Sequence, residues 1–159
     1  MLRIGVAGAG NIASIAQLPT LVARDDVELR GLVTRKDDPQ PLMQRWGFRR
    51  ACPTVEALLE TEELDALFVL TPRSEHVQAT RLALEAGVDV FCEMPLATSA
   101  SDAQYLAELA AVRQRALMVG FNRRFRGEQR ELLRRPEQPG RLGVPRHLRE
   151  RVSGTAVRP

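Results

Sequence analysis

Several residue types and patterns that mark whole classes of proteins are scarce in this sequence. No apolar run approaches the ~20 residues that a membrane-spanning helix needs, so we expect no contact with a membrane. The two cysteines, Cys52 and Cys92, lie far apart and match no metal-binding spacing, so we expect no metal site. Two buried free thiols in a cytoplasmic protein are the favoured interpretation, not a disulfide. The N-terminus has no secretory cleavage site, and we interpret it as mature structure.

Lysine is almost absent, because Lys36 is the only one among 23 basic residues. The charge is also uneven: residues 1–112 carry a net charge of −6 and residues 113–159 one of +9. A basic segment can bind nucleic acid, but this one has few aromatic residues and no recognisable nucleic-acid motif. We therefore favour a solvated arginine-rich face, or a surface toward another part of a larger protein, and expect no nucleic-acid partner.

What the sequence does contain is a regular alternation of strand and helix patterns. This alternation predicts an α/β protein with a doubly wound parallel sheet and helices on both faces, which gives three αβα layers. The predicted strands are Leu2–Ala7, Val27–Thr34, Arg50–Cys52, Ala66–Leu70, Val88–Cys92 and Ala116–Gly120. The predicted helices are Ile12–Ala23 with a bend or break at Pro19, Leu42–Trp46, Val55–Glu60, Glu75–Ala86 and one from Ser99 to about Gln114. Beyond these we expect a helix at Gly127–Arg135, a linker at Pro136–Pro145 and a strand at His147–Val152.

A glycine-rich turn, G-x-G-x-x-A, follows the first predicted strand. Gly8 would allow the tight turn, Gly10 would let the backbone approach a pyrophosphate, and Ala13 would permit close packing of helix on strand. The backbone N–H groups of Asn11 and Ile12 would then face the phosphates at the start of a helix. Placed at the start of a βαβ series, this turn predicts a Rossmann NAD(P)-binding fold. The alternative is a sterically required turn that binds nothing.

The end of the second predicted strand bears on which dinucleotide is bound. Dinucleotide sites that take NAD usually have an acidic residue there, which holds the ribose 2′-hydroxyl. Here the strand ends in Thr34, Arg35 and Lys36, a hydroxyl and two cations that suit a 2′-phosphate. We therefore favour NADP over NAD as the cofactor. Asp37 and Asp38 follow directly, and a shifted turn could bring one of them in instead.

Further motifs follow the glycine turn in a fixed order. They are Thr71-Pro72 with His76 and a helix ending in Ala86-Gly87, then Glu93-x-Pro95, then the run VGFNRRF at residues 119–125. Together with the turn they resemble the N-terminal half of the Gfo/Idh/MocA family, named for glucose–fructose oxidoreductase and inositol dehydrogenase. The resemblance covers residues 2 to about 126.

The resemblance implies a Rossmann domain followed by a larger α/β domain that binds substrate. Members of the family transfer hydride between NAD(P) and a carbon of a sugar or cyclitol. By the same resemblance, Thr71 and Pro72 would line the ribose and nicotinamide, Glu93 would lie near the nicotinamide ribose, and Asn122 would lie at the rim. His76 is in the family's place, but a histidine at a helix start is as often structural as functional. We expect residues 1–126 to form the cofactor domain and the basic residues 127–159 to begin a substrate domain that is otherwise missing.

Position 94 departs from the family's pattern, which has a lysine between the glutamate and the proline. In the family that lysine contacts cofactor and substrate and assists proton transfer, whereas Met94 carries a thioether that cannot hold a proton at neutral pH. The aspartate and histidine that the second domain supplies in the family also have no counterpart here. We expect a cofactor-binding domain with no intact catalytic residue.

Three other functions stay open from the sequence alone. One is a non-catalytic regulator or scaffold that senses dinucleotide, and a second is one half of an oxidoreductase made of two chains. A third is a truncated gene product. A sugar-like small molecule, a second copy of the chain or a different partner chain are all compatible with these alternatives.

Overall fold

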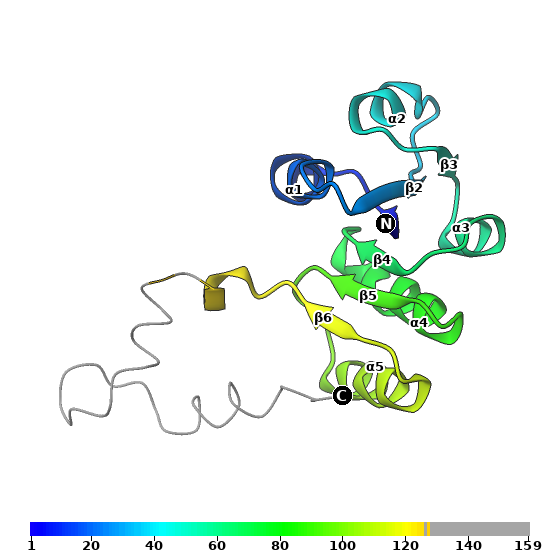
Figure 1. Cartoon of the computed structure of the whole chain (residues 1–159). Helices are drawn as coiled ribbons and strands as arrows, with labels where there is room; N and C mark the ends of the chain where they lie inside the picture. The colour runs from blue at the N-terminus through cyan, green and yellow to red at the C-terminus, as the bar shows by residue number, and fades with distance from the viewer. Residues whose placement is uncertain (126, 128–159) are drawn as a thin grey trace. The chain divides into compact units, whose positions relative to one another are not determined.

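A computed structural model of the chain describes residues 1–125 and 127 (Figure 1). Its centre is a parallel sheet of six strands in the order β3-β2-β1-β4-β5-β6. The strands are β1 Leu2–Ala7, β2 Val27–Val33, β3 Arg50–Cys52, β4 Ala66–Val69, β5 Asp89–Cys92 and β6 Leu117–Val119. This order and direction confirm the predicted doubly wound sheet. Residues Met1–Phe121 form one compact unit.

Helices cover both faces of the sheet. Their bounds are α1 Leu18–Val22, α2 Gln40–Trp46, α3 Val55–Thr61, α4 His76–Glu85 and α5 Ala100–Arg113, with 3₁₀ turns at Arg73–Glu75 and Asn122–Phe125. Side chains alternate between the faces along each strand, so Leu67 and Val69 of β4 join one core cluster and Phe68 joins the other. The first cluster includes residues of α3, α4 and α5, and the second includes residues of α1 and α2. The three αβα layers follow from this division.

The predicted first helix differs from the observed one. Instead of a regular helix bent at Pro19, a π-helical segment at Ala13–Gln17 precedes α1, and the N–H of Leu18 donates to the carbonyl of Ala13. A proline inside an α-helix has no N–H to donate, and its ring clashes with the carbonyl four residues earlier, here that of Ile15. The wider π turn immediately before Pro19 is a known way for a helix to absorb such a local defect.

Smaller differences concern the ends of elements. Strand β2 ends at Val33, so Thr34 lies just outside it, and α2 begins at Gln40, two residues earlier than the predicted Leu42. Gly47 and Gly87 close α2 and the α4 segment with positive φ, as expected for glycine after a helix. The predicted linker and last strand, and all of the predicted helix at 127–135 beyond its first residue, lie outside the described residues. None of the helices in the described part has the length and apolar character needed to cross a membrane.

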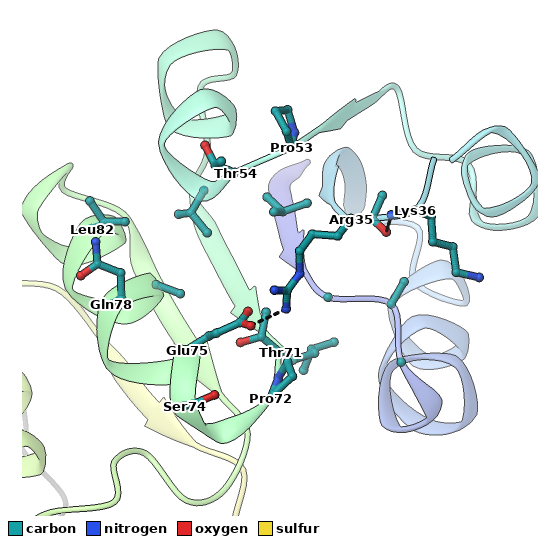
Figure 2. A pocket seen from close by; sticks show the side chains of 18 of the residues that line it. Arg35, Lys36, Pro53, Thr54, Thr71, Pro72, Ser74, Glu75, Gln78 and Leu82 are labelled. Carbon is teal, nitrogen blue, oxygen red and sulfur yellow. Dashed lines mark hydrogen bonds and ion pairs between the residues drawn. The ribbon is translucent and has the colours of Figure 1, made fainter. Parts of the chain in front are cut away.

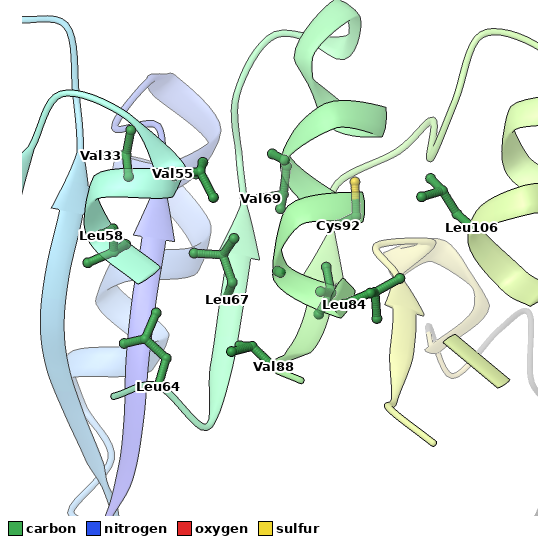
Figure 3. Close-up of a cluster of buried hydrophobic side chains, with 14 of the residues drawn as sticks. Val33, Val55, Leu58, Leu64, Leu67, Val69, Leu84, Val88, Cys92 and Leu106 are labelled. Carbon is green, nitrogen blue, oxygen red and sulfur yellow. The ribbon is translucent and has the colours of Figure 1, made fainter. Parts of the chain in front are cut away.

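Two glycines inside the sheet leave space for Leu58 of α3 and for Leu64, the leucines labelled in Figure 3. A Cβ atom on Gly31 of β2 would overlap Leu58 Cδ1, and one on Gly5 of β1 would lie 2.6 Å from Leu64 Cδ1. Leu58 is fully buried, so it has no free space into which to move. The absence of a side chain at these two strand positions therefore lets the helix pack directly on the sheet.

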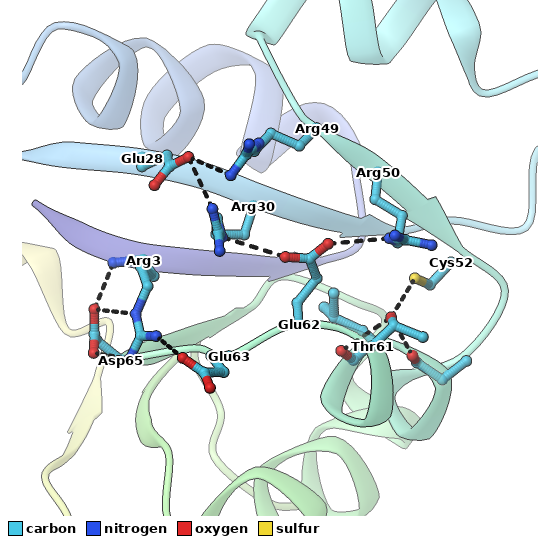
Figure 4. Close-up of polar contacts among 12 residues, drawn as sticks. Arg3, Glu28, Arg30, Arg49, Arg50, Cys52, Thr61, Glu62, Glu63 and Asp65 are labelled. Atoms are coloured by element: carbon cyan, nitrogen blue, oxygen red, sulfur yellow. Dashed lines mark hydrogen bonds and ion pairs between the residues drawn. The ribbon is translucent and has the colours of Figure 1, made fainter.

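Charged residues form ion pairs near the amino ends of the strands, at the edge of the sheet opposite the carboxyl ends of β1, β2 and β4 (Figure 4). Arg3 bonds Asp65 through its backbone N–H at 2.7 Å and through its guanidinium at 2.9 Å. These hydrogen bonds from Arg3 lower the pKa of Asp65 to about 2. Arg30 contacts Glu28 and Glu62 at 3.1 and 3.2 Å. Arg3 and Arg30 therefore have structural partners within the domain.

We predict that Gly31→Ala lowers the free energy of unfolding by about 1–3 kcal/mol, because the added methyl group overpacks a full core. Urea unfolding measures this. Gly10→Ala is the matched control, since no protein atom lies within 4 Å of a Cβ placed there, and its unfolding midpoint should stay unchanged. Equal losses in the two variants would show that the packing of Leu58 on Gly31 is not the cause.

Candidate functional site

A pocket of about 720 Å³ opens at the carboxyl ends of β1, β2 and β4 (Figure 2). The strand order reverses between β1 and β4, and open α/β sheets bind ligands at such a switch point. The volume is in the range of small-molecule sites. The walls come from the glycine turn after β1, the residues after β2 and β3, the Leu70–Glu75 segment and the first turns of α4.

The two glycines of the turn have different reasons to be glycine. Gly8 has φ of +94°, and a Cβ there would lie 2.8 Å from the carbonyl oxygen of Leu70. Its N–H also donates to the carbonyl of Val33 at 3.0 Å. The position of a Cβ on Gly10, by contrast, has no protein atom within 4 Å. The fold itself requires Gly8, whereas at Gly10 the protein leaves open space on the pocket side.

The start of the following helix is divided between pocket and core. Asn11 and Ile12 line the pocket and are exposed. Ala13 does not line it, because it is fully buried in the core cluster that contains Leu18. This matches the packing role that the sequence predicts for Ala13, so only the residues before it face the pocket.

Charged side chains lie at the rim next to the end of β2. Thr34, Arg35 and Lys36 all line the pocket, and the guanidinium of Arg35 forms an ion pair with Glu75. Asp37 and Asp38 are not among the lining residues. The carboxylate of Asp38 instead accepts a hydrogen bond of 3.0 Å from the N–H of Gln40 at the start of α2.

Thr71 and Pro72 line the pocket on the side of β4. The hydroxyl of Thr71 is buried and has no hydrogen-bond partner among the described residues, although buried polar groups are normally paired. A hydroxyl of this kind fits a polar ligand that would supply the missing partner. Together with the open backbone at Gly10 and the rim cations, it gives the pocket the donors and the space that a dinucleotide needs.

His76 lies behind the pocket and does not line it. Its side chain is only 2% exposed, with Nε2 2.8 Å from the carbonyl oxygen of Thr71 and Nδ1 2.7 Å from that of Pro95. A neutral imidazole has one N–H and can donate to one of these carbonyls, and a protonated one donates to both. His76 therefore connects the Thr71 loop to the loop after β5. In the contacts that the structure shows, its role is structural.

Glu93 and Met94 follow β5 and are not among the lining residues. The carboxylate of Glu93 accepts a hydrogen bond of 2.8 Å from the side-chain amide of Gln17 and one of 3.2 Å from the N–H of Met94. The Met94 side chain is 55% exposed. The loop that carries the predicted departure from the family is thus tied to the helix after the glycine turn by Gln17.

Asn122 begins the 3₁₀ turn Asn122–Phe125, is exposed, and belongs to the second compact unit of the chain, which starts at this residue. Cys52 and Cys92 are both free and buried, as predicted. Burial raises the pKa of the Cys92 thiol to about 11, so it stays protonated and unreactive at neutral pH. No group of His, Cys, Asp and Glu side chains in the described part of the chain is arranged to hold a metal ion.

The structure therefore brings nine of the predicted site residues to one pocket, and it leaves Ala13, His76 and Glu93 outside its walls. Sequence reasoning missed several lining residues, namely Pro53, Thr54, Glu56, Ser74, Glu75, Gln78 and Leu82. Pro53 and Thr54 had a usable signal, because they follow a predicted strand of the parallel sheet and so reach the same edge. Glu75 had none, because only the fold brings it to Arg35.

The sheet order and this pocket define a dinucleotide-binding domain of the Rossmann class. A family model described as "Oxidoreductase family, NAD-binding Rossmann fold" matches residues 2–121, and the chain belongs to this family, the Gfo/Idh/MocA oxidoreductases.

Individual relatives agree with this assignment. YceM of Salmonella typhimurium is 35% identical over 95% of this chain and 48% of its own length. A myo-inositol 2-dehydrogenase of Thermotoga maritima is 30% identical over 93% of this chain and 44% of its own length. The chain thus spans less than half the length of these curated relatives.

Among solved structures, a mutant 3-ketoreductase from Actinomadura kijaniata in complex with TDP-benzene and NADP is similar with a TM-score of 0.77. It is 31% identical, and the match covers 83% of this chain and 42% of the reductase. A scyllo-inositol dehydrogenase from Lactobacillus casei with NAD(H) and scyllo-inositol also has a TM-score of 0.77, at 20% identity over 84% and 40% of the two chains. This second likeness is one of fold.

We predict that His76→Leu lowers the free energy of unfolding by about 1–3 kcal/mol, because it removes the imidazole between the carbonyls of Thr71 and Pro95 and leaves a buried carbonyl without a donor. Gln78→Leu is the matched control on the same helix. Gln78 is exposed, so this change should stay within about 0.5 kcal/mol. Urea unfolding of both variants measures the difference, and equal effects would contradict the assigned role of His76.

Proposed function

We propose that the pocket binds NADP(H), and that the open backbone at Gly10 carries this assignment. The N–H groups of Asn11 and Ile12 lie beside Gly10 at the start of the helical segment, where backbone donors and the helix dipole favour a pyrophosphate. Gly8 holds the turn in shape, whereas the open space at Gly10 would let the phosphates approach the backbone there. Residues 1–126 would be the cofactor domain, and residues 127–159 would begin a substrate-binding part.

The rim favours NADP over NAD. No acidic residue follows β2 directly, and neither Asp37 nor Asp38 is among the residues that line the pocket. Thr34, Arg35 and Lys36 would hold the 2′-phosphate, with Arg35 able to bind it through two N–H groups. The similar structure with bound NADP supports the same choice.

The remaining predicted residues would act at the other end of the cofactor. The unpartnered hydroxyl of Thr71 and the adjacent Pro72 would line the nicotinamide ribose. Glu93 would lie near that ribose, held in place by Gln17, and His76 would position the Thr71 carbonyl from behind. Asn122 would contribute at the rim.

When bound, the nicotinamide supplies hydride chemistry, and in this family the hydride is exchanged with a sugar or cyclitol carbon. The chain's own residues would bind and orient the cofactor, but proton transfer lacks a group at position 94. The exposed Met94 thioether is a weak acceptor and no acid. We therefore infer that the domain binds cofactor and is catalytically incomplete by itself. The same methionine favours a second candidate, a regulator that senses dinucleotide without turnover.

Titration of the chain with NADPH, NADP⁺, NADH and NAD⁺, followed by thermal shift and calorimetry, tests the binding proposal. We expect a micromolar-range dissociation constant for NADPH, weaker binding of NADH, and a stability gain of about 2.7 kcal/mol at a hundredfold excess over that constant. Gly10→Ala should weaken the binding of NADPH at least tenfold without changing the stability of the free protein. No binding at millimolar cofactor would overturn the proposal.

The missing proton-transfer group is tested by Met94→Lys. The missing substrate domain is supplied as a second chain, and oxidation of myo-inositol, glucose and other polyols is followed through NADPH formation at neutral pH. Because a positioned acid–base group is typically worth ~10²–10⁴ in rate, we expect the Met94 protein to be at least about a hundredfold slower than the lysine variant. If the Met94 protein turns over and the Met94→Lys variant is no faster, another group carries the proton.

A further inference from the structure

We propose that Glu75 determines cofactor specificity by competing with the 2′-phosphate of NADP(H) for Arg35. This inference rests on the proposed binding of a dinucleotide in the pocket. It concerns the ratio of the affinities for NADPH and NADH. In this inference Glu75 weakens the binding of NADPH and so reduces the preference for it.

The two side chains meet across the pocket from distant parts of the chain. Arg35 follows the end of β2, and Glu75 is the last residue of the 3₁₀ turn before α4. Figure 2 shows the Arg35 side chain extending from the β2 end toward Glu75, with the ion pair drawn beside Thr71 and Pro72. Both residues line the pocket, so the pair forms part of the wall that a bound cofactor would contact.

Glu75 is held in place more firmly than its partner. Its backbone N–H donates to the carbonyl of Pro72 at 2.9 Å, and the next residue, His76, is buried and bonded to two loops. The Arg35 side chain is 75% exposed, against 37% for Glu75. A ligand that needs the guanidinium would therefore draw Arg35 away, and the carboxylate would stay at the rim.

The charge balance at the rim then depends on the cofactor. A 2′-phosphate carries close to two negative charges and would have to replace Glu75 as the partner of Arg35, with the carboxylate still nearby. NADH has no phosphate at this position, so the ion pair could persist, and the Glu75 oxygens could accept a hydrogen bond from a ribose hydroxyl. Lys36, which forms no ion pair among the described residues, would remain available to the phosphate. Glu75 thus narrows the difference in affinity that Arg35 and Lys36 create.

The opposite geometry is a clamp, in which the Arg35–Glu75 pair closes over either cofactor and strengthens both. The two arrangements give opposite results when the carboxylate is removed. Competition predicts tighter NADPH, whereas a clamp predicts weaker binding of both cofactors.

The test measures dissociation constants of NADPH and NADH by calorimetry for the full chain and its variants. Glu75→Gln should lower the dissociation constant of NADPH about three- to tenfold and change that of NADH less than twofold. This is the size of effect expected when an exposed charge acts on a phosphate. The gain should shrink at 0.5 M NaCl, because salt screens exposed charges. Arg35→Gln should weaken the binding of NADPH. In the Arg35→Gln protein, the further change Glu75→Gln should alter the dissociation constant of NADPH by at most half as much as it does in the unaltered chain.

Glu85→Gln is the matched control, because it removes a carboxylate that pairs with an arginine on the same helix, Arg81, but outside the pocket. It should leave both dissociation constants unchanged. An unchanged NADPH-to-NADH ratio in Glu75→Gln, or weaker binding of both cofactors, would overturn the inference while leaving the proposed function in place. Failure of the unaltered chain to bind either cofactor would overturn both.

Discussion

The close approach of the glycine turn to the end of β4 is the constraint on which the rest of this structure depends. At Gly8 the backbone of β1 turns so near the Leu70 carbonyl that no Cβ atom fits, and the same residue bonds to Val33 at the end of β2. One residue thereby fixes the ends of three strands relative to each other. The pocket between them is consequently built by backbone packing, and side chains at its rim are left to set charge and specificity.

A second set of contacts fixes the loop after β5 relative to the pocket. His76 bonds the carbonyls of Thr71 and Pro95, and Gln17 bonds Glu93, so the pocket wall and the Glu93–Pro95 loop hold each other. All of these bonds use groups other than the side chain at position 94. The identity of residue 94 can therefore change without loss of the surrounding structure, which is why a chain with methionine there still has the fold of its family.

Much of this was predictable from the sequence, and the exceptions have physical reasons. The strands and the glycine turn are encoded locally, in apolar runs and in two glycines at a fixed spacing. The π-helical segment was not predicted, because the defect that Pro19 introduces can be absorbed by a bend, a break or a wider turn. The Arg35–Glu75 pair, the Gln17–Glu93 bond and the two partners of His76 join residues far apart in the chain, and no pattern in one sequence specifies such contacts.

The central claim is that the backbone around Gly10 receives the cofactor's phosphates. The most direct measurement is a titration of the isotope-labelled chain with NADPH, followed residue by residue in ¹H–¹⁵N correlation spectra. We expect the largest shifts at the amides of Gly10, Asn11 and Ile12, with further shifts at Thr34 to Lys36 and little change along β6. Saturable binding with its largest shifts away from the glycine turn would contradict it.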